Sequence, residues 1–399
     1  MKTPFNARAP SFDATSINET IQRALARAGL DITSGPMRNV TETIRRALAS
    51  GGMADTARSP VSCVSVTDVM ARVVDVRPDG TRAPNRKPWV GEAQAPATFE
   101  TREYGNHAGT RSYKVYIPAR EQNLPMPMLV MLHGCTQSAD DFAAGTQMNR
   151  LADEFGFLVV YPEQPAHANA SKCWNWFKSQ DQGRDAGEPS LIAGIVRDVA
   201  ARHGADPRRI FVAGLSAGAA MAVILGETYP ELFAGVGVHS GLPYGSAHDI
   251  PSAMAAMKGG RSGLVGLKGM PGHAAAPARK AARAVPTIVF HGDRDHTVQM
   301  TNGTEIVRQA SDAHLAETGD ATPLSASTQR GTAPGGRSYS RTVHADAQGR
   351  PHIESWTLHG GGHAWSGGDA SGSHTDGLGP DASAEMVRFF LAVTPAGSA

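Results

Sequence analysis

Gly214-Leu215-Ser216-Ala217-Gly218 is the stretch of this sequence that decides the fold, because of the residues on either side of it. Residues 209–213 are mostly β-branched and apolar and predict a buried strand, whereas residues 217–229 predict a helix. A serine between two glycines at such a strand-to-helix turn stands at the apex with its hydroxyl exposed. The helix N-terminus adds partial positive charge beside a developing oxyanion, so Ser216 is predicted to be a nucleophile. The alternative is a turn that merely begins a helix.

A nucleophilic serine needs a base, and the base needs an orienting carboxylate, which precedes it in the chain in this arrangement. Residues 285–290 predict a buried strand, and Asp293 and Asp295 follow it at the carboxyl edge of the sheet, where sites form. Asp295 is favoured because a residue further along the loop has more room to reach a distant imidazole. Asp293 is the alternative acid, and either aspartate would otherwise cap the following turn.

The candidate base is His363. Residues 352–358 alternate and predict a strand, and His359-Gly360-Gly361-Gly362-His363-Ala364-Trp365 comes next. Three glycines make a flexible loop that can bring the imidazole over the serine, with Trp365 packed beside it. The same glycines disfavour a helix that would join His359 and His363 as metal ligands, and no further ligand motif appears, so no metal or cofactor is expected.

A fourth element predicts the oxyanion hole. Residues 128–132 form a short apolar run that predicts a buried strand, and His133-Gly134-Cys135 follows directly. In the corresponding hydrolases one amide comes from the residue after the nucleophile, here Ala217, and the other from such a loop, here Cys135. Otherwise Cys135 is a small apolar side chain without a role.

These elements, in this order, predict an α/β-hydrolase fold with a mostly parallel sheet that helices cover on both faces. Residues 97–104 and 112–117 alternate and predict an antiparallel edge. Residues 245–284 are interpreted as a lid or cap, and residues 318–340 as a surface loop. The remaining strands are expected near 157–161 and 234–239, and the helices near 139–155, 188–203, 217–229, 301–316 and 382–392.

Five segments within residues 95–395 match a known family: Leu132-His133-Gly134-Cys135-Thr136-Gln137, Cys173-Trp174-Asn175-Trp176-Phe177, Gly214-Leu215-Ser216-Ala217-Gly218, His239-Ser240-Gly241-Leu242-Pro243 and Gly362-His363-Ala364-Trp365. Together they resemble the polyhydroxybutyrate depolymerase-type esterases, which also include feruloyl and acetylxylan esterases. The resemblance implies a carboxylesterase for aliphatic hydroxyacid esters or small acyl esters. It also implies the roles of Ser216, Asp295 and His363 given above, and the oxyanion amides of Cys135 and Ala217.

The same resemblance places Trp174 and Trp176 beside the substrate cleft. Alternate residues of an extended segment face one side, so the two indoles would form an apolar wall there. The alternative is core packing with both indole N–H groups satisfied. His133 and His239 are assigned to the pocket as well.

Composition limits the partners. The net charge of +1 gives no reason to expect nucleic acid, and no apolar run is long enough for a membrane span. The three cysteines, Cys63, Cys135 and Cys173, do not make a disulfide framework. Reduced thiols and a cytoplasmic protein without a signal peptide are expected, and a Cys135–Cys173 bridge and an extracellular location are the alternatives.

The first hundred residues have a different character. Residues 1–60 are predicted to be a helical extension, residues 61–96 a linker rich in Pro and Gly towards its end, and residues 97–399 the catalytic domain. Two capping boxes, at 16–19 and 39–42, begin short amphipathic helices. Residues 16–50 would either contact polyester granules or a lipid surface, or form a helical hairpin that packs on the catalytic domain or is partly disordered. The second interpretation is favoured.

A polymer-binding module is not recognised, so soluble oligomers, amorphous polyester or small esters are the expected substrates. Other functions keep the same triad. An acyltransferase, a thioesterase or a peptidase would differ in the acceptor or the leaving group. A tethered binding protein would carry an inactive hydrolase domain.

Overall fold

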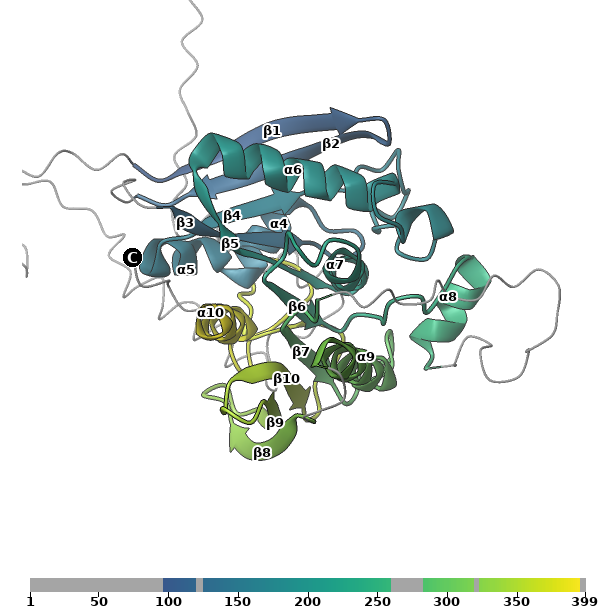
Figure 1. Cartoon of the computed structure of the whole chain (residues 1–399), viewed down its shortest axis with the longest axis vertical. Helices are drawn as coiled ribbons and strands as arrows, with labels where there is room; N and C mark the ends of the chain where they lie inside the picture. Colours follow the sequence, from purple (N-terminus) through teal and green to yellow (C-terminus); the bar gives the residue numbers. More distant parts are fainter. Residues whose placement is uncertain (1–95, 120–124, 260–282, 319–322, 395–399) are drawn as a thin grey trace, which may run out of the picture. The chain divides into compact units, whose positions relative to one another are not determined.

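A mixed sheet forms the centre of the described part of the chain (Figure 1). The computed structural model describes residues 96–119, 125–259, 283–318 and 323–394, which all belong to the unit Gly91–Ala399. The order across this ten-stranded sheet is β1-β2-β4-β3-β5-β6-β7-β10-β9-β8. Its strands are β1 (Thr98–Asn106), β2 (Gly109–Ile117), β3 (Met126–Leu132), β4 (Leu158–Pro162), β5 (Ala205–Leu215), β6 (Gly235–His239), β7 (Thr287–Gly292), β8 (Ser325–Thr332), β9 (Ser338–Ala345) and β10 (Pro351–Leu358).

Several predictions fall on residues outside this description. They are the helical extension at 1–60 with its proposed surface contact at 16–50, the linker at 61–96 except Pro96, and Cys63. Most of the predicted lid, residues 260–282, is outside it as well. Within the described part, residues 245–259 contain the short helix α8 (Ile250–Met257), which Asp249 caps.

The central strands β4, β3, β5, β6, β7 and β10 run parallel, which confirms the predicted parallel sheet. Strands β3, β4, β6 and β7 are buried along their whole length. A strand covered on both faces has no polar side, and this explains why these segments are continuous apolar runs rather than alternating ones. The antiparallel edge of β1 and β2 is also as predicted.

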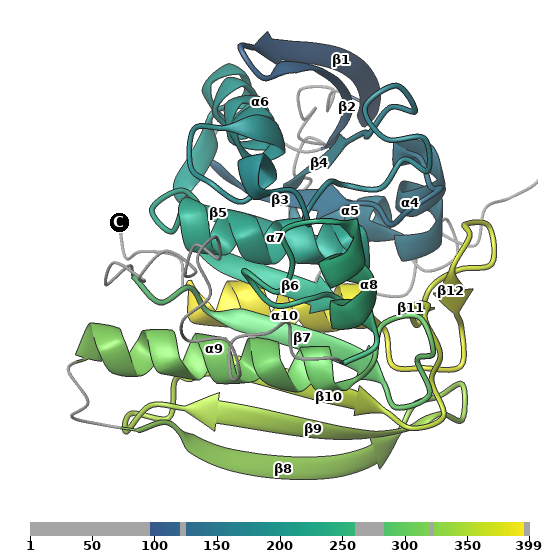
Figure 2. The ribbon, with the colours of Figure 1, turned by 90° about the vertical axis from the view of Figure 1, so that its right-hand side faces the viewer.

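Helices cover both faces of the sheet, as Figure 2 shows with α7 and α9 in front of it and α10 behind. One face carries α6 (Gly187–His203), α7 (Ala217–Thr228) and α9 (Thr301–Thr318). The other carries α4 (Ala139–Thr146), α5 (Met148–Phe155) and α10 (Ala382–Val393). Successive side chains of a strand point to opposite faces, so β3 places Met128 and Val130 in one core cluster and Leu129 and Met131 in the other.

Two of the predicted elements are wrong. Residues 139–155 form two helices instead of one, because Gln147 adopts a left-handed conformation, φ 53°, between α4 and α5. Residues 318–340 are not a surface loop: residues 325–332 form β8, which pairs antiparallel with β9 at the sheet edge. Nearly all of β8 is exposed and polar, so no alternation of apolar residues marked it as a strand.

In the described ranges no helix is long and apolar enough to cross a lipid bilayer.

Candidate active site

Ser216 stands at the turn between β5 and α7. Its backbone angles, φ 56° and ψ −118°, lie in a region that residues with a side chain rarely adopt, and its amide donates to the His239 carbonyl, 2.9 Å away. A Cβ on Gly214 would lie 2.4 Å from the Gly218 carbonyl carbon, and one on Gly218 would lie 2.1 Å from the Leu132 oxygen. Glycine is therefore required at both positions for the close approach, and the partly exposed serine side chain is forced to the apex.

Asp295 follows β7 and contacts His363, which follows β10. The Asp295 side chain is fully buried, and its Oδ1 accepts from the amides of Thr297, 2.9 Å, and Val298, 2.8 Å. Its Oδ2 lies 2.7 Å from Nδ1 of His363. Burial raises the pKa of Asp295, but the hydrogen bonds from His363 and Val298 outweigh burial and hold the pKa below its usual value. The carboxylate is thus charged at neutral pH and oriented towards one imidazole nitrogen.

The three residues follow the carboxyl ends of parallel strands. Ser216 follows β5, Asp295 follows β7 and His363 follows β10, and the strands from β5 to β10 are parallel neighbours through β6. Carboxyl ends of parallel strands lie at one edge, so the topology places the three residues at the same edge of the sheet although they are far apart in the sequence.

The loop after β3 carries Cys135, whose amide is the predicted oxyanion donor. The Gly134 amide donates to Oε1 of Gln137, 2.9 Å, and the Thr136 amide donates to the Ser171 carbonyl, 2.8 Å. The Cys135 amide lies between these two anchored groups. Ala217 is the first residue of α7, and the first amides of a helix have no intrahelical acceptor. Amides of this kind, in a loop or at a helix N-terminus, can donate to an anion.

Comparison with known proteins assigns the chain to a family. Residues 111–326, more than half of the chain, match the family model described as esterase PHB depolymerase. The chain belongs to this family.

Relatives of this PHB depolymerase-family chain include a depolymerase and a probable esterase. It is 32% identical over 277 residues to poly(3-hydroxyalkanoate) depolymerase C of Paucimonas lemoignei, which covers 69% of this chain and 63% of that protein. It is 35% identical over 142 residues to a probable acetylxylan esterase A of Aspergillus fumigatus, 35% of this chain and 37% of that protein. The chain therefore spans less than two thirds of the length of these relatives.

Among solved structures, an acetyl xylan esterase from Aspergillus awamori is 19% identical, with a TM-score of 0.49 over 70% of this chain and 93% of that one.

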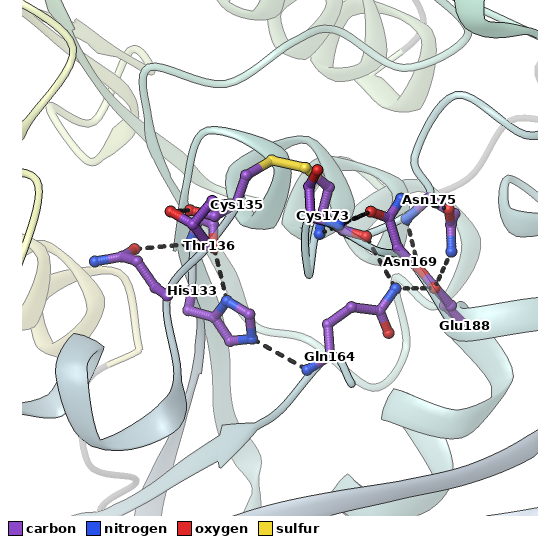
Figure 3. The surroundings of a disulfide bond; sticks show 11 residues. His133, Cys135, Thr136, Gln164, Asn169, Cys173, Asn175 and Glu188 are labelled. Atoms are coloured by element: carbon purple, nitrogen blue, oxygen red, sulfur yellow. Dashed lines mark hydrogen bonds between the residues drawn. A yellow bond between two sulfur atoms is a disulfide. The ribbon is translucent and has the colours of Figure 1, made fainter. Parts of the chain in front are cut away.

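Cys135 and Cys173 form a disulfide, with an S–S distance of 2.04 Å (Figure 3). The expectation of reduced thiols is therefore wrong for this pair, and the bridge considered as its alternative is present. The two cysteines are 38 residues apart in sequence, but they follow the adjacent parallel strands β3 and β4. A cysteine count carries no information about that proximity, which explains the error.

The predicted pocket residues of this PHB depolymerase-family site are more buried than a pocket lining requires. His133, Trp174 and His239 have no exposed surface, so they cannot line an open cavity in this structure. The pocket interpretation is corrected for these three, which are fully buried residues in this structure. Trp176 is 6% exposed and packs edge-to-face on Phe177, so it too is largely a core residue.

The two buried histidines are fixed in the neutral form. His133 has Nδ1 2.7 Å from the Gly134 oxygen, and its Nε2 accepts from the Gln164 amide, 3.1 Å (Figure 3). Nε2 of His239 accepts from the Ser366 amide, 3.0 Å. Burial lowers the pKa of both imidazoles, that of His239 to about 3. Because one nitrogen of each ring must accept, the other carries the proton.

Sequence reasoning missed the buried residue Glu188, which anchors the segment around Cys173. Its carboxylate accepts from Nε2 of Gln164, 2.5 Å, and from both the amide, 2.7 Å, and the side-chain nitrogen, 2.6 Å, of Asn175 (Figure 3). Nη2 of Arg111 lies 3.3 Å from the same carboxylate. Burial and the neighbouring Asp181 raise the pKa of Glu188. An acidic residue in the first turn of a helix is so common that the sequence offered no signal.

Sequence reasoning also missed the contacts of Gln137 and Asp293. The Gln137 side chain is buried and connects Gly134 to Asp141, with Nε2 2.8 Å from the Asp141 carboxylate. Asp293 does not contact His363: its Oδ2 lies 3.0 Å from Nδ1 of His359.

Within the described residues no group of three or more metal-binding side chains is arranged around a common point.

Proposed function

We propose that the protein is a serine carboxylesterase, with Ser216 as nucleophile, His363 as base and Asp295 as the orienting acid. The observation that carries the proposal is the 2.7 Å contact of Asp295 with His363 at the sheet edge where Ser216 occupies its strained turn. A charged, buried carboxylate bound to Nδ1 leaves Nε2 of the imidazole free to accept a proton.

In the proposed reaction Ser216 Oγ attacks the ester carbonyl while His363 removes its proton. The amides of Cys135 and Ala217 donate to the oxyanion of the tetrahedral intermediate. His363 then protonates the departing alcohol, and water hydrolyses the acyl-enzyme by the same route, so that Ser216 is regenerated. Asp295 stabilises the imidazolium in both steps.

The substrates that we propose are esters of short hydroxyacids, as oligomers of 3-hydroxybutyrate or as amorphous polyester, or small acyl esters. The name of the Paucimonas lemoignei relative supports the first class and that of the Aspergillus fumigatus relative supports small acyl esters. The alternatives are a feruloyl or acetylxylan type of esterase, and an acyltransferase or thioesterase that uses the same triad.

The test is hydrolysis of p-nitrophenyl esters from acetyl to octanoyl and of 3-hydroxybutyrate oligomers, by wild type and Ser216→Ala. Ser327→Ala, an exposed serine of β8, is the matched control and should keep wild-type activity. Loss of activity only in Ser216→Ala supports the proposal, and the chain-length profile distinguishes the substrate classes. A folded Ser216→Ala protein that still hydrolyses these esters would overturn it. Ester cleavage that occurs only with an added alcohol or thiol acceptor would favour a transferase.

We also propose that the protein acts in an oxidising compartment, which corresponds to the extracellular alternative. The Cys135–Cys173 disulfide supports this, because such bonds persist outside the reducing cytosol. Alkylation of protein from cells and from medium, with and without reductant, tests it. Reduced Cys135 and Cys173 in protein found only in the cytosol would contradict it.

A further inference from the structure

A second aspartate–histidine pair lies beside the proposed triad. Asp293 precedes Asp295 by two residues, and His359 precedes His363 by four. Oδ2 of Asp293 lies 3.0 Å from Nδ1 of His359, and Nε2 of His359 lies 2.9 Å from Oγ of Ser340 on β9. The order of contacts, aspartate to histidine to serine, repeats that expected of the triad.

This second set is poorly suited to be a second catalytic centre. Ser340 lies inside β9, where it pairs with Arg330 of β8 on one side and Thr357 of β10 on the other. The amides around it therefore belong to the sheet ladders and are not available to an oxyanion. Donors aimed at the oxyanion usually provide the largest part of such catalysis, so the half-buried Ser340 without them is a poor nucleophile.

We propose instead that Asp293 and His359 are positioning residues, which hold the loop that carries His363 against the loop that carries Asp295. The inference rests on the proposed function, and it assigns Asp293 a role distinct from that of the triad acid.

The two loops are joined at successive residues. Oδ1 of Asp293 accepts from the Gly360 amide, 2.7 Å, in addition to the contact with His359. The Asp293 amide donates to the Leu358 carbonyl, 3.1 Å, and the Arg294 amide donates to that of Gly361, 3.0 Å. Asp293 and Arg294, on the loop that carries Asp295, thus both have partners on the loop that carries His363. The hydrogen bonds of His359 and Gly360 lower the pKa of Asp293 although burial raises it, so the anchoring carboxylate is charged.

The loop that carries His363 needs such an anchor because of its composition. Gly360 adopts a left-handed conformation, φ 71°, and a Cβ on Gly362 would meet nothing within 4 Å. Glycines lose the most conformational entropy on ordering, so three of them in a row leave the position of His363 weakly specified by the chain itself.

The contacts on both sides of the glycines supply the missing restraint. Before them, the His359 carbonyl accepts from Nη1 of Arg337, 3.1 Å, and Nε of Arg337 donates to Asp376, 2.6 Å. After them, the buried Trp365 donates through its amide to the His374 carbonyl, 2.7 Å, and through Nε1 to Ser383, 3.0 Å. His363 therefore lies between two fixed points, of which Asp293 and His359 form the first.

The test compares truncation with conservative replacement. We expect Asp293→Ala and His359→Ala to lower kcat for p-nitrophenyl butyrate by about tenfold to a hundredfold, with KM within about threefold, because an imidazole misplaced by about 1 Å costs that much. Asp293→Asn keeps the acceptor for Gly360, and His359→Asn keeps a donor near Nδ1, so both should recover most of kcat. The matched control is His352→Ala, which removes a similar pair with Asp346, 3.4 Å, at the other end of β10.

A second measurement does not depend on turnover. In Ser216→Ala protein, the downfield imidazole N–H proton resonance that disappears in His363→Ala reports the contact between His363 and Asp295. We expect its exchange with water to accelerate in the Asp293→Ala and His359→Ala variants and to stay unchanged in His352→Ala. Wild-type kcat and an unchanged resonance in both truncations would overturn the positioning role. So would a loss of kcat that the conservative variants do not recover. An inactive wild type with these NMR effects would instead overturn the proposed function alone.

Discussion

The Asp295 carboxylate lies 2.7 Å from Nδ1 of His363, and its other oxygen is held by two backbone amides. This division of its two oxygens has a chemical consequence. An oxygen saturated by amides cannot rotate away, so the second one remains aimed at the imidazole and selects the tautomer with the proton on Nδ1. Asp293, the other candidate acid, is bound to a different histidine, so the geometry supports Asp295 as the acid of the triad.

Asp295→Asn should lower kcat by roughly a thousandfold to ten-thousandfold while the protein stays folded. The amide of asparagine would donate to Nδ1 and favour the tautomer with the proton on Nε2, which cannot accept the proton of Ser216. Steady-state hydrolysis of p-nitrophenyl butyrate, with circular dichroism to check folding, measures this. Asp293→Asn is the matched comparison, and its loss of kcat should be far smaller. The reverse ranking would show that Asp293 is the acid.

Gln137→Ala should lower kcat about tenfold or more and destabilise the protein by about 1–3 kcal/mol. The substitution leaves the Gly134 amide and the Asp141 carboxylate without their buried partner, and it releases the loop that presents the Cys135 amide. Kinetics and urea unfolding measure the two effects. Gln329→Ala, on the exposed strand β8, is the control. A Gln137→Ala protein with wild-type kcat would show that the loop is held without this side chain.

The parallel core of the fold was predictable because its strands are covered on both faces and must be apolar throughout, as in β3 and β4. The sheet edge at β8 was not predictable on the same basis. Strand β8 is held in the sheet by pairing with β9 and not by burial, so its polar sequence indicated a loop. The break at Gln147 was missed for a related reason: left-handed backbone at a residue other than glycine depends on packing and not on local preference.

In the site, the spacing of residues predicted where the backbone must turn, but it did not predict which side chains contact one another. Gly214 and Gly218 are required because a Cβ at these positions would lie 2.4 and 2.1 Å from backbone atoms. The motif around Ser216 therefore has a steric cause that the sequence reveals. Whether an aromatic or a histidine at the end of a strand faces a cavity or the core depends on neighbours from other strands. His239 illustrates this, because it stacks on Phe290 and Trp365, which come from β7 and from the short strand β11 (Trp365–Ser366).

Replacing both Cys135 and Cys173 by serine should lower the free energy of unfolding by roughly 2–4 kcal/mol. The bond closes a loop of 38 residues in sequence and ties the predicted oxyanion loop to the segment that Glu188 anchors. The comparison is made in a Cys63→Ser background, so that no free thiol can exchange with the disulfide. Urea unfolding of both proteins gives the difference, and kcat should fall as well. Equal stability with and without the two cysteines would contradict the prediction.

His239 should make stability fall as the pH is lowered. In the folded protein burial lowers the pKa of His239 to about 3, and its Nε2 accepts from the Ser366 amide, so a second ring proton would face another N–H. In the unfolded chain a histidine has a pKa of about 6.5. Between these values the unfolded state binds a proton that the folded state does not, so this residue's contribution is full above about pH 6.5 and decreases as the pH falls towards 3, by about 1.4 kcal/mol per pH unit.

The measurement is urea unfolding of wild type and His239→Gln from pH 7 to pH 4. Glutamine keeps an acceptor within reach of the Ser366 amide but does not titrate, so the variant should have a shallower pH dependence of unfolding free energy, by about that slope. Part of the wild-type slope should remain, because burial also lowers the pKa of His133 and His291. His167→Gln, at an exposed position, is the matched control for the substitution itself. If His239→Gln keeps the full wild-type slope, then His239 is protonated in the folded protein, and the hydrogen bond from Ser366 to its ring cannot exist at low pH.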